Sequence, residues 1–116
     1  MTGRVSYLAG MAAEDSVVRG YEREGYETVA RRWRGSGGEI DLVLRDRDGF
    51  VFVEVKKARD LARAAQRLSQ AQLARICQSA CEFLGSVPGG MLMDMRFDLA
   101  MVDATGRMAR YRNITM

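Results

Sequence analysis

The sequence GEIDLVLRDRDGFVFVEVKK, residues 38–57, decides the fold of this chain. Two runs within it alternate with the period of a β-strand, and the link between them ends in Asp48-Gly49, a pair typical of tight turns. A turn centred on Arg47 and Asp48 predicts three apolar pairs across the hairpin: Ile40 with Val55, Leu42 with Val53, and Leu44 with Val51. The stretch therefore predicts a β-hairpin with one apolar face.

The opposite face of this hairpin brings like charges together. The same register places Asp41 across from Glu54, and Glu39 across from Lys56. Facing carboxylates destabilise a hairpin unless a positive group lies between them. A divalent cation held by Asp41 and Glu54, with Lys56 beside it, would remove the repulsion and suit phosphodiester chemistry. The alternative is a pair of edge-of-sheet carboxylates that are solvated or bridged by arginines.

The whole chain has the composition of a folded protein. Its 116 residues allow one compact domain, which we expect to span residues 1–116, because two independent cores would need a longer chain. The N-terminus lacks the apolar stretch of a signal peptide, and no segment is long enough to span a bilayer. We therefore expect a cytoplasmic protein without a membrane partner.

The sequence contains no histidine. Catalytic Ser-His and Cys-His arrangements are excluded, and a zinc site would have few ligands. Cys77 and Cys81 lie four residues apart in a helical pattern, which is poor geometry for a disulfide, so we expect buried reduced thiols. Catalysis would rest on carboxylates, lysine and a metal ion. Mg²⁺, which Mn²⁺ can replace, suits such an all-oxygen site.

Apolar spacing outside the hairpin predicts two helices and three further strands. They lie at residues 7–24 (helix), 26–33 (strand), 69–84 (helix), 96–103 (strand) and 107–114 (strand). Gly25 ends the first helix, and Ser69 with Gln72 matches a capping box at the start of the second, with an earlier start through Leu61 and Leu68 as an alternative. The predicted order is helix-strand-strand-strand-helix-strand-strand, an α/β fold.

Glu14 is a second unusual placement, because it lies in the apolar stripe of the first predicted helix. Apolar residues surround it at the three-, four- and seven-residue steps that define one helix face. A buried carboxylate needs a partner or a metal ion. A structural ion pair with a cation such as Arg34 or Lys56 is the alternative to a functional role.

Three side chains have supporting roles in this hypothesis. Lys56 would orient or deprotonate the attacking water, or stabilise the charge of the transition state. Glu39, which faces Lys56, would hold the lysine in place. Gln72 has a sufficient structural role in the capping box, and positioning water or phosphate is the alternative for it.

A basic run lies at the end of the first predicted strand. Arg31, Arg32 and Arg34, with Trp33 between them, would grip a nucleic-acid backbone and stack a base. The alternative places Trp33 in the core and the arginines on a solvated rim.

Five motifs resemble those of the YraN-like family of bacterial proteins, in the same order and over nearly the whole chain. They are AE at 13–14, GY at 25–26, GEIDL at 38–42, FVEVK at 52–56 and RFD at 96–98. The resemblance implies the restriction-endonuclease-like fold of the PD-(D/E)xK nuclease superfamily, related to archaeal Holliday-junction resolvases, with a mixed central sheet flanked by helices. It also implies that Asp41 and Glu54 bind the metal, that Lys56 is the catalytic lysine, and that Glu14 is the extra acidic residue.

The sequence thus predicts a magnesium-dependent endonuclease that hydrolyses DNA with a metal-activated water, with branched or repair intermediates as candidate substrates. One alternative is a nucleic-acid-binding module that keeps the fold without efficient catalysis. Another is an interaction protein whose acidic site is structural. Because junction-cleaving relatives work as dimers and the last strand has an exposed edge, a homodimer is a further expectation.

Overall fold

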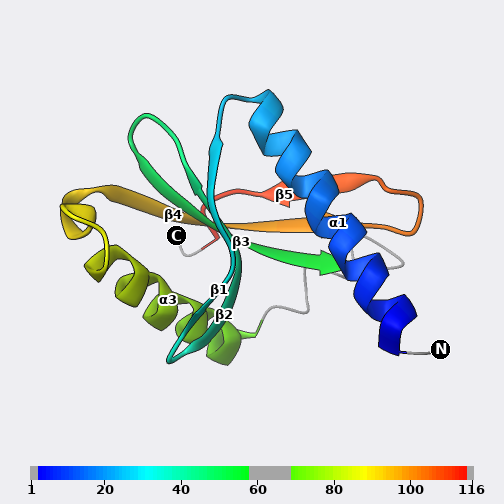
Figure 1. The fold of residues 1–116 in the computed structure, drawn as a ribbon, viewed down its shortest axis with the longest axis horizontal. Helices are drawn as coiled ribbons and strands as arrows, with labels where there is room; N and C mark the ends of the chain where they lie inside the picture. Colours follow the sequence, from blue (N-terminus) through cyan, green and yellow to red (C-terminus); the bar gives the residue numbers. More distant parts are fainter. Residues whose placement is uncertain (1–2, 58–68, 115–116) are drawn as a thin grey trace.

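The computed structural model describes residues 3–57 and 69–114, and its elements follow the predicted order (Figure 1). They are α1 (Gly3–Arg23), β1 (Glu27–Gly35), β2 (Gly38–Arg45), β3 (Gly49–Lys57), α3 (Gln70–Gly85), the 3-10 turn η2 (Gly90–Leu92), β4 (Asp94–Val102) and β5 (Met108–Tyr111). Leu61 and Leu68, where an earlier start of the second helix was considered, lie outside the described residues. Within those residues, no helix is long and apolar enough to cross a membrane.

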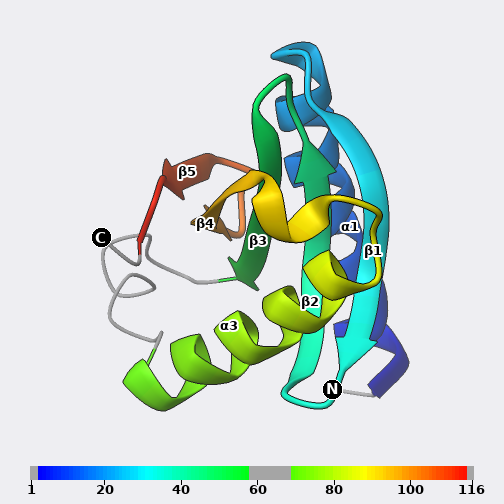
Figure 2. The same cartoon turned by 90° about the vertical axis from the view of Figure 1, so that its left-hand side faces the viewer.

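The described strands form one mixed sheet in the order β1-β2-β3-β4-β5. Neighbouring strands are antiparallel except β3 and β4, which are parallel. A parallel pair needs a crossover, and α3 lies within it. Figures 1 and 2 show α1 and α3 on opposite sides of the sheet. The predicted α/β fold, with a mixed sheet flanked by helices, is confirmed.

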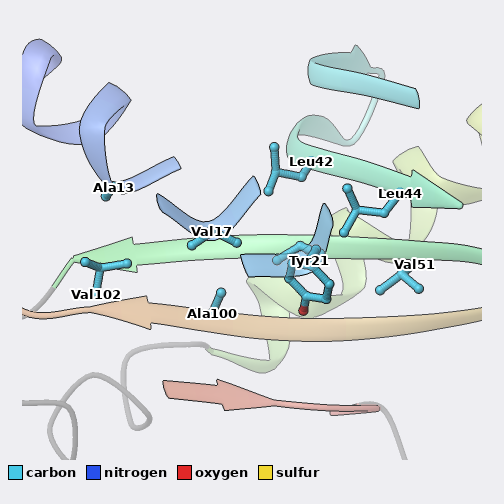
Figure 3. Packing of buried hydrophobic residues seen from close by; sticks show 9 residues of the cluster. Ala13, Val17, Tyr21, Leu42, Leu44, Val51, Ala100 and Val102 are labelled. Atoms are coloured by element: carbon cyan, nitrogen blue, oxygen red, sulfur yellow. The ribbon is translucent and has the colours of Figure 1, made fainter. Parts of the chain in front are cut away.

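Each helix covers its own apolar cluster on the sheet. On the α1 side, Val17 and Tyr21, four residues apart on one helix stripe, are fully buried (Figure 3). The cluster on this side comprises Ala13, Val17, Tyr21, Leu42, Leu44, Val51, Val53, Ala100 and Val102. On the α3 side, Trp33 packs edge-on against Phe83 with ring centroids 5.4 Å apart. Trp33 is half-buried and packs against the core, which is closer to the core interpretation than to a base-stacking one.

The ends of the helices follow the predicted signals. Gly25 adopts φ +95° after α1, a left-handed conformation that favours glycine. Ser69 caps α3, and its hydroxyl accepts the Gln72 N–H at 3.1 Å. Cys77 and Cys81 are both free thiols, as predicted. The expectation that both are buried is wrong, because Cys81 lies on the solvent side of α3.

The turn between β1 and β2 is fastened to α3. The Ser36 N–H donates to Glu82 Oε2 at 2.8 Å, and the Ser79 hydroxyl donates to the Gly38 carbonyl at 2.9 Å. At Gly37 the backbone lies so close to the helix that an added Cβ would be 2.5 Å from the Arg75 carbonyl oxygen. We call residues 35–38 with their contacts on α3 the turn anchor.

Strands β2 and β3 separate before they reach their ends. Their ladder includes the predicted pairs of Leu44 with Val51 and of Leu42 with Val53. Beyond Leu42, β2 continues with β1 alone and β3 continues with β4 alone (Figures 1 and 2). The predicted pair of Ile40 with Val55 is wrong, because the turn anchor draws β2 toward α3 and Ile40 packs in the α3-side cluster. We call this separation the strand fork.

Candidate active site

Asp41 lies where the strand fork opens. Its Oδ2 atom accepts the Val55 N–H at 2.8 Å, so a side chain takes the place of the main-chain acceptor that a continued ladder would provide. Asp41 is half-buried, and Glu54, the residue before Val55, is only 9% exposed. Two carboxylates are thus partly shielded from solvent where the β2–β3 ladder ends.

The electrostatics of these two carboxylates show that they are close neighbours. Burial, followed by the charge of Glu54, raises the pKa of Asp41 to about 7. Burial also raises the pKa of Glu54, although the charge of Lys56 and a hydrogen bond from the Asp41 carboxyl partly offset the rise. The pair therefore holds a proton near neutral pH, because two negative charges at this spacing are unfavourable.

Two side chains contact the same oxygen of Glu54. Lys56 Nζ lies 3.2 Å from Glu54 Oε1, and Gln72 Nε2 donates to that atom at 3.3 Å. Gln72 thus caps α3 through its main chain and contacts the acidic pair through its side chain. From the sequence, helix capping and positioning at the site were alternative roles for Gln72. The structure allows this residue to have both.

Glu14 reaches the site from α1 and is 7% exposed. Arg32 binds it with two hydrogen bonds of 3.3 Å, and Arg31 lies 3.5 Å away. The ion pair that was the alternative to a functional role is therefore present. Its cations are Arg31 and Arg32 of β1; Arg34 and Lys56, which were named as partners, pair with Glu39 and Glu54 instead. After burial and Glu54, the charge of Glu14 also contributes to the raised pKa of Asp41.

Arg32 has the left-handed backbone conformation, with φ +53°. In the β1–β2 ladder, Arg31 pairs with Leu42 and Trp33 pairs with Ile40. Arg32, the residue between them on β1, is therefore opposite Asp41 on β2. A non-glycine residue in this conformation costs about 1 kcal/mol or more, and such strain is concentrated at functional sites. The strained residue of β1 is thus the one that holds Glu14.

The donor set suits a hard divalent cation, because it consists of partly buried carboxylate oxygens, whose raised pKa values the charge of Lys56 only partly offsets. Asp41 and Glu54 are the two side chains that would hold it. Within residues 3–57 and 69–114, however, no three acidic, histidine or cysteine side chains lie close enough together to form a ready-made metal site. Glu14 in particular is engaged with Arg32.

Comparison with known proteins places the chain in a family. Residues 13–102 match the model described as "Uncharacterised protein family UPF0102". The chain belongs to this family. A UPF0102 protein of Ruegeria pomeroyi is 55% identical over 96% of this chain and 90% of its own length. Another, from Cereibacter sphaeroides, is 50% identical over 97% of each chain, and one from Dinoroseobacter shibae is 49% identical over 98% of this chain and 85% of its own length.

The other polar residues predicted for the site have different partners in this UPF0102 chain. Glu39 lies 3.5 Å from Arg34 and not beside Lys56, because β2 has turned away from β3 beyond the strand fork. Arg31 donates to Asp15 at 2.8 Å. All three arginines that were predicted to bind nucleic acid therefore lie in ion pairs, and among them Arg34, with its side chain 79% exposed, is the most accessible.

A hollow of about 190 Å³ lies beside the acidic pair, between α3 and the turn anchor. Its lining residues are Gly37, Gly38, Glu39, Glu54, Gln72, Arg75 and Ile76. The sequence did not single out Arg75. The one available signal was its position three residues after Gln72, which places both side chains on one helix face.

The sequence also did not predict the polar network around Asp98. This residue is 1% exposed, and it accepts hydrogen bonds from the Tyr21 hydroxyl at 2.7 Å and from Arg96 Nε at 3.0 Å. Arg96 in turn donates to the Tyr26 hydroxyl at 2.8 Å. The GY and RFD motifs, which were among those that resemble the YraN-like family, thus meet in one network on the α1 side of the sheet.

Proposed function

We propose that this UPF0102 protein is a metal-dependent endonuclease that hydrolyses phosphodiester bonds in DNA, with branched or repair intermediates as candidate substrates. The observation that carries the proposal is the pair Asp41 and Glu54, buried together at the strand fork with Lys56 Nζ 3.2 Å from Glu54. Two carboxylates that repel each other are stabilised by a divalent cation. A lysine beside them can balance the charge of a phosphate.

Each residue has a role in this proposal. Asp41 and Glu54 would hold Mg²⁺ or Mn²⁺, which when bound supplies Lewis-acid stabilisation and activates water. Lys56 would turn from Glu54 to the phosphate and stabilise the developing charge, while Gln72 keeps the Glu54 carboxylate oriented. Glu14 is the third candidate ligand, and it would have to exchange its contact with Arg32 to reach the ion.

A second candidate function is a nucleic-acid-binding module on the same fold, without efficient catalysis. The observation that favours it is the absence of a three-carboxylate cluster among the described residues. Both candidates have DNA as the partner, and we propose the cytoplasm as the place where they meet it. The outer edge of β5, Met108–Tyr111, is the surface through which we propose a homodimer would form.

The direct test is incubation of the purified protein with linear, single-stranded and four-way-junction DNA, with and without Mg²⁺ or Mn²⁺. We expect metal-dependent cleavage that Asp41→Ala, Glu54→Ala and Lys56→Ala each reduce by about 100-fold or more. Asp48→Ala is the matched control, because it removes an exposed carboxylate from the β2–β3 turn at the far end of the hairpin. It should leave cleavage unchanged.

The same variants separate the two candidates. If cleavage is absent, or survives both Asp41→Ala and Glu54→Ala, the endonuclease proposal fails. Salt-dependent DNA binding that needs no metal and persists in both variants would then identify the binding module. Mn²⁺ should also raise the melting temperature of the wild type and not that of Asp41→Ala, because the ion binds the folded state through both carboxylates.

A further inference from the structure

The cations that are available to a ligand near the strand fork are not those that the sequence indicated. Arg31, Arg32 and Arg34 lie in ion pairs with acidic side chains. Lys57 and Arg75 are both exposed, and neither forms an ion pair within the described residues. An exposed cation without a carboxylate partner can bind a phosphate without first breaking another contact.

Arg75 lies on the α3 side of the acidic pair. It follows Gln72 by three residues, so the two side chains share a helix face. Gln72 contacts Glu54, and Arg75 lines the same 190 Å³ hollow as both of them. A phosphate in this hollow would therefore meet a guanidinium group next to the carboxylate of Glu54.

Lys57 lies on the other side of the pair. It is the last residue of β3, and successive side chains of a strand point to opposite faces, so it faces away from Lys56 and toward α1. It lines a second hollow, of about 340 Å³, together with Ala12, Ala13 and Ser16 of α1, Val102 at the end of β4, and Asp103, Ala104 and Gly106 of the β4–β5 turn. Ala13 directly precedes Glu14, so this hollow adjoins the α1 side of the site.

The two hollows are lined by residues that lie close together along β3. Glu54 lines the first hollow, and Lys57, three residues further along β3, lines the second. Three strand residues span about 10 Å. Each strand of a duplex carries one phosphate per about 3.4 Å of helix axis, so this distance covers about three nucleotides. The small side chains of Ala12 and Ala13 leave room for the strand beside α1.

We propose that Arg75 and Lys57 are the phosphate contacts of this site, and that a nucleic-acid strand crosses the strand fork from the α3 hollow to the α1 hollow. Asp41, Glu54 and Glu14 would repel such a strand, and the two flanking cations offset that repulsion. Arg75 can bind a phosphate with two hydrogen bonds, whereas Lys57 acts as a point charge. Both contacts are to the backbone, so they fix the path of the strand and not its sequence. The inference takes the position of the acidic pair from the proposed function, but it concerns binding alone.

The test compares Lys57→Ala, Arg75→Ala and the double variant with the wild type. Binding of a fluorescent single-stranded or duplex oligonucleotide is measured by anisotropy, without divalent ions, over a series of salt concentrations. Each substitution should weaken binding about fivefold and lower the slope of log affinity against log salt by about one. The double variant should lower the slope by about two.

Two controls make the outcome specific. Arg47→Ala removes the same charge from an exposed position in the β2–β3 turn, and it should leave the affinity and the salt slope unchanged. Melting curves of all variants should match the wild type, because the substituted side chains are exposed and make no ion pair within the described residues. An equal loss on Arg47→Ala, an unchanged double variant, or a wild type that binds no nucleic acid would each overturn the inference.

Cleavage by the same variants, measured separately with Mg²⁺ or Mn²⁺ added, keeps the two proposals apart. If the wild type cleaves DNA and the double variant keeps its affinity and salt slope, the phosphate contacts are wrong and the endonuclease proposal stands. If the wild type does not cleave but binding falls as expected in the double variant, the endonuclease proposal fails and the contacts stand.

Discussion

A single side chain marks the point where the β2–β3 ladder ends. The Asp41 carboxylate accepts the Val55 N–H, so the main chain of β3 stays satisfied although β2 has turned away. The same contact brings Asp41 beside Glu54. Burial, and then the charge of Glu54, raise the pKa of Asp41, whereas the hydrogen bond from Val55 lowers it. The Asp41 carboxylate thus stabilises the strand fork by accepting a hydrogen bond, and its negative charge, which is buried near Glu54, destabilises the fork.

This conflict predicts how stability depends on pH. The pKa of Asp41 is about 7 in the folded protein, against an ordinary value of 3.8. Between these values the folded state keeps a proton that the unfolded chain has released, so the free energy of unfolding falls as pH rises through this window. Asp41→Asn keeps an acceptor for Val55 and removes the charge. We expect it to be more stable than the wild type by about 2 kcal/mol at about pH 8.

Chemical denaturation at several pH values measures this difference. The advantage of Asp41→Asn should shrink as pH falls and disappear below about pH 3, where the wild-type carboxyl is also neutral in both states. Equal stability of the two proteins at pH 8 would show that the folded protein accommodates the negative charge of Asp41 without penalty.

At the scale of elements, the turn anchor explains why β2 leaves β3. Residues 35–38 lie against α3 and are held by Glu82 and Ser79. Gly37 is essential for this approach because a Cβ would meet a carbonyl oxygen of the helix main chain, which has little freedom to move. The geometry of the acidic pair therefore depends on a contact between two segments that lie far apart in the sequence.

Gly37→Ala should lift the turn from α3. An added Cβ would lie 2.5 Å from the Arg75 oxygen, so we expect a loss of about 1–3 kcal/mol in the free energy of unfolding, measured with urea. Gly85→Ala is the matched control at the end of α3, where the added Cβ meets nothing within 4 Å. It should be neutral or slightly stabilising. The same loss in both variants would mean that the close approach at Gly37 is not what matters.

The helices and strands were predictable because each depends on a pattern of neighbouring residues in the sequence. Alternation of apolar residues predicts the pairs of Leu42 with Val53 and of Leu44 with Val51, and Ser69 predicts the start of α3. The strand fork was not predictable, since it depends on the turn anchor. The pairing of Glu14 with Arg32 escaped prediction for a related reason, because it needs the left-handed backbone of Arg32 and the position of α1 beside β1.

At the scale of the whole molecule, Asp98 joins parts that are distant in the chain. Its carboxylate accepts the hydroxyl of Tyr21 from α1, the guanidinium of Arg96 from β4, and the N–H of Asn113 after β5, the last at 3.1 Å. Burial and the hydrogen bond to Asp98 raise the pKa of Tyr21, so the hydroxyl remains a donor. The network holds α1, the sheet and the C-terminal segment together on the side away from α3.

Asp98→Asn should therefore destabilise the whole fold. The change leaves the partly buried guanidinium of Arg96 without its counter-charge, and we expect a loss of about 3 kcal/mol in the free energy of unfolding. Tyr21→Phe, which removes one neutral donor to the same carboxylate, should lose about 1 kcal/mol. Thermal and chemical denaturation measure both values. A loss on Asp98→Asn no larger than that on Tyr21→Phe would show that the charge is not the main contribution of this residue.

The parallel pairing of β3 with β4 predicts an order in which the chain folds. Strands β2 and β3 pair across a short turn. Strand β3 pairs with β4 over a much longer distance in the sequence, because Gly49 is opposite Asp94, about 45 residues further along the chain. Local contacts of this kind form in microseconds, and non-local ones follow more slowly. We therefore expect Asp41 and Glu54 to come together while water still surrounds them, and to lose that water in the late step in which α3 packs on the sheet.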